Sequence, residues 1–88
     1  MLPFGLWVKQ RRKELDLTQE ELSLCVGCSL VLIQKIEEGR RRPSKQIAEL
    51  LAQHLAVPSG ERPDFVRFAR SGTAEPVPMI LARGIIMG

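Results

Sequence analysis

Apolar residues recur at spacings of three and four along most of the chain, which is the period of an amphipathic helix. Five segments carry this pattern, and polar or helix-breaking residues separate them. The first is expected from Pro3 or Phe4 to Leu15, and the others at Gln19–Val26, Ser29–Glu38, Lys45–Ala56 and Glu61–Arg70. Short helices with short connections predict an all-α domain, a compact bundle of four to five helices.

Capping signals fix the ends of the second and third segments. Thr18 is an N-cap candidate, and Glu21 stands three residues later, where it completes a capping box. Gly27 ends the second helix, because a glycine adopts the left-handed backbone conformation at little steric cost. Ser29 caps the third helix and Gly39 ends it. Two helices joined by a tight, glycine-containing turn have the spacing of a helix-turn-helix.

Three stretches carry a more specific signal: LTQEEL at Leu17–Leu22, VGCS at Val26–Ser29 and IQKIEEGRRRPS at Ile33–Ser44. In content, order and spacing they resemble the helix-turn-helix of the phage lambda repressor and Cro-like family, the Xre family of bacterial regulators. The resemblance covers Phe4–Val57 and, more loosely, Glu61–Arg70. It implies a lambda-repressor-like fold and a transcriptional regulator that binds double-stranded DNA.

Composition and charge agree with a small folded domain that binds a polyanion. The chain has 88 residues, of which 44% are hydrophobic and 26% charged, and this balance argues against disorder. Its net charge is +3 and its pI is about 9.3. Two basic blocks flank the predicted helix-turn-helix and favour phosphate binding: Lys9, Arg11, Arg12 and Lys13, then Arg40, Arg41, Arg42 and Lys45.

We expect residues 1–70 to form the DNA-binding domain and residues 71–88 to form an irregular, linker-like tail. SGTAEPVP holds a glycine and two prolines, and the apolar MILARGIIMG is too short for a stable isolated helix or a membrane span. The lack of a span and of a convincing signal peptide predicts a cytoplasmic protein. By resemblance, a homodimer or a downstream signalling domain is a further expectation; a stand-alone regulator and a piece of a longer one are both open.

The second helix of the motif is expected to read DNA bases. Ile33 and Ile36 must face the core, which leaves Leu30, Val31, Gln34 and Lys35 towards DNA, with Leu32 on a flank. Gln34 can pair with adenine, and Lys35 with guanine or a phosphate. Many members of the family have polar residues where this chain has three consecutive apolar ones, at positions 30–32. Such side chains read a thymine methyl, so we expect weak or thymine-biased specificity. The alternative is a protein-interaction module, or an antitoxin-like regulator, that uses the same apolar face.

Phosphate contacts are expected from the helix starts and from the second basic block. The predicted phosphate contacts are Gln19, Arg40, Arg41, Arg42 and Lys45, and Thr18 and Ser29 complete the predicted DNA-binding set. Gln19 resembles the glutamine that meets the DNA backbone in the family. The resemblance also implies an ion pair between Arg12 and Glu37, which makes one of the four early basic residues structural.

Other chemistry has little support. Cys25 and Cys28 form a CxxC pair, the pattern of a redox pair or of half a zinc site. Zinc needs about four ligands, and His54 is the only further candidate, so we expect incidental or structural cysteines and a surface or half-buried histidine. The sequence shows no nucleophile-and-base set, carboxylate pair or glycine-rich phosphate loop. We therefore expect no enzyme activity, no cofactor and no metal.

Overall fold

The computed structural model describes residues 3–71, and these form five α-helices and one 3-10 turn. The helices are α1 (Phe4–Glu14), α2 (Gln19–Val26), α3 (Leu30–Glu37), α4 (Lys45–His54) and α5 (Arg62–Ser71), with the turn η1 at Ser59–Glu61. Within this part of the chain there is no strand, and the all-α prediction is confirmed. None of the described helices is long and apolar enough to cross a membrane. Ser71, the first residue of the predicted tail, ends α5. The rest of the predicted tail, residues 72–88, lies outside the described residues.

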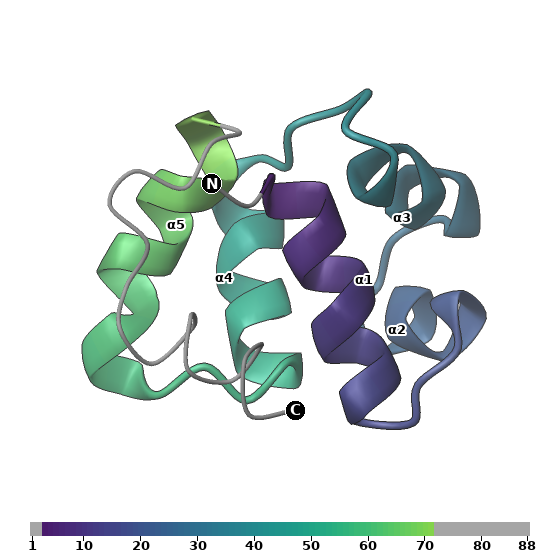
Figure 1. The fold of residues 1–88 in the computed structure, drawn as a ribbon, viewed down its shortest axis with the longest axis horizontal. Helices are drawn as coiled ribbons and strands as arrows, with labels where there is room; N and C mark the ends of the chain where they lie inside the picture. The colour runs from purple at the N-terminus through teal and green to yellow at the C-terminus, as the bar shows by residue number, and fades with distance from the viewer. Residues whose placement is uncertain (1–2, 72–88) are drawn as a thin grey trace.

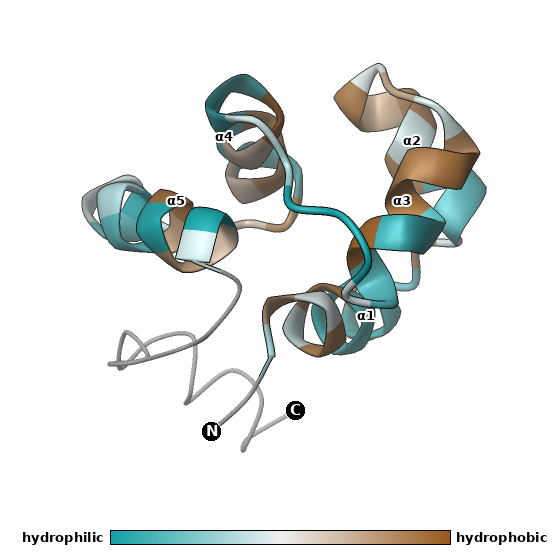
Figure 2. Cartoon of the chain, turned by 90° about the horizontal axis from the view of Figure 1, so that it is seen from above, coloured by the Kyte–Doolittle hydropathy of each residue, from teal (hydrophilic) through white to brown (hydrophobic). Residues whose placement is uncertain are grey.

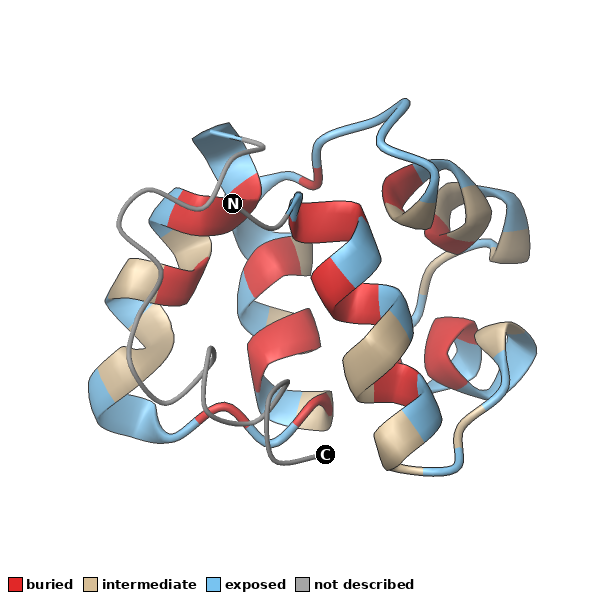
Figure 3. Cartoon of the chain, viewed as in Figure 1, coloured by how far each residue is buried: buried red, intermediate tan, exposed pale blue. Residues whose placement is uncertain are grey.

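The helices surround one apolar core. Figure 1 shows α4 and α5 on one side of the view, α2 and α3 on the other, and α1 running between them. The buried apolar residues lie on the inward sides of all five helices and, at Leu55 and Val57, in the connection that follows α4 (Figure 3). They are Phe4, Trp7, Val8, Leu22, Val26, Ile33, Ile36, Ala48, Leu51, Ala52, Leu55, Val57, Phe65, Phe68 and Ala69. Most of these residues belong to the apolar pattern from which the helices were predicted.

Aromatic side chains join α1 to α5. The ring centroids are 5.0 Å apart for Phe4 and Phe68, 5.3 Å for Phe4 and Phe65, and 5.2 Å for Trp7 and Phe65. Their planes are tilted or perpendicular, which is the favoured arrangement of aromatic pairs. Trp7 is 1% exposed, so the expectation that it is a core residue is confirmed. The fifth helix is therefore an integral part of the domain.

The fourth helix is shorter than predicted. The sequence pattern extends it to Ala56, whereas α4 ends at His54. Ala56 has a φ of 59°, in the left-handed region, and the backbone N–H of Val57 donates to the carbonyl of Ala52 at 2.9 Å. This bond closes the last turn as a C-terminal cap does. An alanine in this conformation gives no sequence signal, because glycine is the residue normally found there.

A glycine allows α1 to approach the end of α3 closely. A Cβ atom placed on Gly5 would fall on the carbonyl oxygen of Ile36 and lie 2.7 Å from that of Glu37. Any side chain at this position would therefore push the two helices apart. This contact fixes the position of the C-terminal turn of α3, and hence of the whole helix.

Candidate nucleic-acid interface

The third helix presents one side to the core and the opposite side to solvent. Ile33 and Ile36 are 0% and 1% exposed. Successive residues of an α-helix turn by about 100°, so the side opposite these isoleucines carries Val31 and Lys35, which are both exposed. Gln34 is half-buried at the edge of this side. The predicted inward positions of Ile33 and Ile36 are thus confirmed. Of the positions expected to face DNA, Val31 and Lys35 are exposed, whereas Leu30 and Gln34 are half-buried.

The three consecutive apolar residues of α3 do not share one surface. Val31 is 54% exposed, whereas Leu30 and Leu32 are half-buried and Leu32 packs against the core. Figure 2 shows that the hydropathy changes along α3, from an apolar first turn to a more polar last turn. Of the three residues on which the alternative hypothesis relies, Val31 is therefore the one that is exposed, and the accessible apolar area is smaller than three exposed side chains would give.

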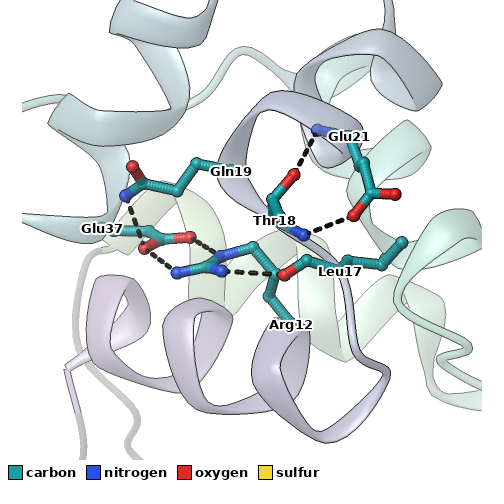
Figure 4. Close-up of polar contacts among 6 residues, drawn as sticks. All are labelled: Arg12, Leu17, Thr18, Gln19, Glu21 and Glu37. Atoms are coloured by element: carbon teal, nitrogen blue, oxygen red, sulfur yellow. Dashed lines mark hydrogen bonds and ion pairs between the residues drawn. The ribbon is translucent and has the colours of Figure 1, made fainter.

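Side-chain caps define where the helices of this region begin. The Thr18 hydroxyl oxygen accepts from the backbone N–H of Glu21 at 3.0 Å, and the Glu21 carboxylate accepts from the N–H of Thr18 at 2.8 Å (Figure 4). The hydroxyl oxygens of Ser29 and Ser44 accept in the same way from the N–H three residues on, at 3.1 and 3.2 Å. Each hydroxyl still has its own proton to donate, and each helix start carries partial positive charge.

A buried ion pair joins the first three helices. Arg12 donates from Nε and Nη2 to the two carboxylate oxygens of Glu37, at 2.7 and 3.1 Å, and from Nη1 to the carbonyl of Leu17 at 2.8 Å (Figure 4). Gln19 Nε2 donates to Glu37 Oε1 at 3.0 Å. The Arg12 and Glu37 side chains are only 8% and 2% exposed. The pairing that the resemblance implied is confirmed, and it holds α3 against both α1 and the start of α2.

The connection from α3 to α4 begins with a glycine cap. Gly39 has a φ of 77°, and the backbone N–H of Arg40 donates to the carbonyl of Lys35 at 2.9 Å. The connection then crosses one end of the molecule to the start of α4 (Figure 1). Pro43 is buried and anchors it, while the three arginines before it remain exposed. It is the most hydrophilic loop near α3 in Figure 2.

Cationic side chains gather on α3, on this connection and at the start of α4. Arg40 lies 3.8 Å from Glu38, and both side chains are largely exposed, so this pair is weak. The other cationic side chains of this surface are exposed and have no hydrogen bond or ion pair within residues 3–71: Lys35, Arg41, Arg42 and Lys45. Four unneutralised cations on adjoining elements can contact several phosphates at once.

The first basic block is more structural than predicted. Arg12 is buried in the ion pair described above, and Arg11 Nε donates to the carbonyl of Leu55 at 3.0 Å. Lys9 and Lys13 are exposed. The resemblance assigned a structural role to one of these four residues, whereas the structure assigns it to two. Two of the four residues of this block are therefore engaged within the domain, and two remain exposed.

A helix-turn-helix family model matches residues 8–61, from α1 to η1. The chain belongs to this family, the Xre and lambda-repressor-like group of DNA-binding domains. The match covers the motif, the arginine-rich connection and α4. No solved structure matches the chain.

Two curated relatives carry names of regulators. An "uncharacterized transcriptional regulator in ATPase CF(0) region" of Rhodospirillum rubrum is 46% identical over 54 residues, which are 61% of this chain and 50% of the relative. An "uncharacterized HTH-type transcriptional regulator" of Methanothermobacter thermautotrophicus is 44% identical over 48 residues, 54% of this chain and 70% of the relative. The chain thus spans half the length of the first of these two regulators.

In this member of the family, the fold brings most of the predicted contact residues to neighbouring elements. The outward residues of α3 adjoin the connection that carries the three arginines, and that connection leads directly to Lys45 (Figure 1). Thr18 and Gln19 lie at the start of α2, beside the end of α3 through the Gln19–Glu37 hydrogen bond. Gln19, Leu30 and Gln34 are half-buried, and the other residues of the predicted set are exposed. The contact of each with DNA stays a prediction.

The two cysteines lie in the last turn of α2 and in the turn before α3. Cys25 is exposed and Cys28 is half-buried, and both are free thiols. Burial raises the pKa of the Cys28 thiol, which makes it a poorer nucleophile and metal ligand. Among residues 3–71 no three His, Cys, Asp or Glu side chains are grouped as a metal ion would need. His54 is half-buried, as expected.

Two residues that position the interface escaped the sequence reasoning. Glycine is unfavourable inside a helix, so the sequence gives no reason for Gly5 in the first predicted helix. The reason is the close approach of α3, which leaves no room for a side chain. In the sequence Arg11 is one charge in a basic run, and its hydrogen bond to the Leu55 carbonyl, just after α4, depends on how α1 and α4 pack. A glycine inside an amphipathic helix could have indicated close packing, but not against which element.

Proposed function

We propose that this protein is a sequence-specific regulator of transcription that binds double-stranded DNA by placing α3 in the major groove. The observation that carries the proposal is the division of α3 into a buried side and an exposed side next to a cluster of unpaired cations. B-form DNA has a major groove about 12 Å wide, which admits one α-helix. The names of the relatives as transcriptional regulators give independent support.

In this proposal base contacts and phosphate contacts come from different elements. The outward residues Val31, Gln34 and Lys35 face the base edges. Arg41, Arg42 and Lys45, with the capped starts of α2 and α4, contact phosphates. About four to six phosphate contacts per monomer would make the affinity fall steeply as salt increases.

The first experiment is selection from a random pool of duplex DNA by the purified protein at near-physiological salt, followed by sequencing. An enriched palindrome supports a dimer that binds two half-sites about one helical turn apart. An enriched single half-site supports a monomeric module. If no sequence is enriched, even when binding is restored at low salt, sequence-specific reading is wrong.

Variants then test the assignment of roles on the enriched site. Arg41→Ala should weaken binding to all sequences alike. It should also reduce the steepness with which the logarithm of the binding constant falls with the logarithm of the salt concentration, by about 1. Lys35→Ala should instead relax the preference at one position, with a loss of about 1–3 kcal/mol, if Lys35 reads a guanine. Arg67→Ala is the matched control, because it removes the same charge from α5, where the Arg67 side chain is 79% exposed and, within residues 3–71, forms its ion pair only with Asp64.

The alternative function, a protein-interaction module, predicts the reverse pattern. Such a module would tolerate Arg41→Ala and Lys35→Ala but lose its partner on Leu30→Glu. The half-burial of Leu30 and Leu32 gives this alternative less support than the cationic surface gives DNA binding.

A further inference from the structure

An apolar side chain occupies the position on α3 where base-reading helices place their most informative contacts. The large apolar residues exposed within residues 3–71 are Leu6, Leu24 and Val31, and of these only Val31 belongs to α3. It is the second residue of the helix, and it is 54% exposed. In helix-turn-helix complexes the first residues of the second helix meet the base edges.

The direction of Val31 is as informative as its exposure. Ile33 and Ile36 fix the buried side of α3, and Val31 lies almost diametrically opposite to them. Lys35 follows one turn later on the same side. Leu30 and Leu32, on either side of Val31, are half-buried and expose less of their side chains. A base pair in contact with the first turn of α3 would therefore meet the valine.

The chemistry of a valine limits what it can recognise in the major groove. Its two methyl groups neither donate nor accept a hydrogen bond. Against most base edges it would remove water from a polar atom without replacing the lost hydrogen bond, which is unfavourable. The exception is the C5 methyl group of a pyrimidine, which projects into the groove and gains from contact with another apolar group.

We infer that Val31 is a specificity-determining residue that packs against the C5 methyl group of a pyrimidine. This inference rests on the proposed function, because it requires α3 in the major groove. The methyl group belongs either to thymine or to 5-methylcytosine. Since Val31 and Lys35 are about 5–6 Å apart along the helix surface and base pairs are about 3.4 Å apart, both contacts should fall within about two base pairs.

The experiment uses the enriched duplex in two series of single substitutions. In the first series each thymine is replaced in turn by deoxyuridine, which removes only the methyl group. In the second series each cytosine is replaced by 5-methylcytosine, which only adds one. Binding of each duplex is measured by fluorescence anisotropy for the wild-type chain, for Val31→Ala and for Leu24→Ala. Leu24 is 75% exposed on α2 and controls for the loss of an exposed apolar side chain.

The inference predicts one methyl-sensitive position in each half-site. Deoxyuridine at that position should weaken wild-type binding about fourfold, or 5-methylcytosine should strengthen it about fourfold, which is the effect of burying one methyl-sized group. Val31→Ala should abolish this sensitivity, and Leu24→Ala should retain it. The first series identifies thymine as the source of the methyl group and the second identifies 5-methylcytosine.

Two outcomes overturn the inference, and they can be told apart. If a site is enriched but no methyl substitution changes wild-type affinity, or if the sensitivity survives in Val31→Ala, then Val31 is not the methyl reader and the proposed function stands. If no duplex is enriched, the proposed function and the inference fail together. Circular dichroism of Val31→Ala checks that the helices are intact, as expected for an exposed position.

Discussion

Replacing Glu37 by glutamine should destabilise this domain severely, although the two side chains have the same shape. The two carboxylate oxygens of Glu37 accept three hydrogen bonds, two from Arg12 and one from Gln19. A glutamine has only one oxygen, so in either orientation its NH₂ group would face at least one N–H donor. The Arg12 side chain is only 8% exposed, and its guanidinium would then lack a counter-charge.

The expected loss is large compared with the stability of so small a domain. Breaking a buried ion pair by removing one partner costs about 3–5 kcal/mol, because a buried charge is left uncompensated. The free energy of unfolding that a single core of this size supplies rarely exceeds about 3–5 kcal/mol. At about 4–8 °C for each kcal/mol, a loss of 3 kcal/mol lowers the Tm by roughly 12–24 °C. Thermal and urea unfolding followed by circular dichroism at 222 nm measure this directly.

A neighbouring residue provides the matched control. Glu38→Gln removes the same charge one position later, where Glu38 and Arg40 are 3.8 Å apart with side chains 59% and 74% exposed. An exposed pair of this kind contributes less than about 1 kcal/mol. An ordinary surface substitution changes the free energy of unfolding by less than about 0.5 kcal/mol. If the change for Glu37→Gln is as small as this, the Arg12–Glu37 pair is not what holds α3 in place. Adding Arg12→Met to Glu37→Gln should recover part of the loss, since it removes the buried charge; no recovery would refute the electrostatic explanation.

Other positions give sharper local tests. Gly5→Ala should cost about 1–3 kcal/mol in urea unfolding, because the new Cβ meets the carbonyl oxygens at the end of α3; an unchanged midpoint would mean that α1 and α3 are not in close contact. Ala56→Gly should have the opposite effect and raise the stability by about 1 kcal/mol, since glycine adopts the φ of 59° without strain; a destabilised variant would contradict the left-handed conformation. Iodoacetamide should alkylate Cys25 faster than Cys28, each measured with the other cysteine changed to serine. Burial raises the pKa of Cys28 and keeps it protonated to higher pH, so its alkylation should accelerate only at higher pH; equal rates at neutral pH would contradict its burial.

The helix-turn-helix could be predicted from the sequence almost residue by residue. The bounds of α2 were predicted as Gln19–Val26, and the structure has the same bounds. The reason is that both ends of α2 are fixed by local chemistry. Thr18 and Glu21 form the capping box within one turn, and Gly27 adopts a φ of 81° beside the last residue. Each of these signals involves residues that are near one another in the chain.

The contacts that orient α3 could not be predicted in this way. Gly5 and Ile36 are adjacent in space but 31 positions apart in the chain, and nothing in the sequence pattern links them. The pairing of Arg12 with Glu37 was available only from the resemblance to a family, because any of the four early basic residues satisfies the charge pattern. The partial burial of Leu32 also depends on how neighbouring helices pack on α3.

The contacts that hold α3 and the inferred methyl reader, Val31, lie at opposite ends of the helix. Gly5 and Arg12 of α1 contact Ile36 and Glu37, in the last turn of α3, whereas Val31 is in its first turn. A variant that displaces the last turn without unfolding the domain would move every base contact together. Gly5→Ala should therefore weaken binding to all sequences in similar proportion, while Val31→Ala should change the preference at one position. If Gly5→Ala instead altered the preference at a single position, the bases would be read nearer the C-terminal end of α3.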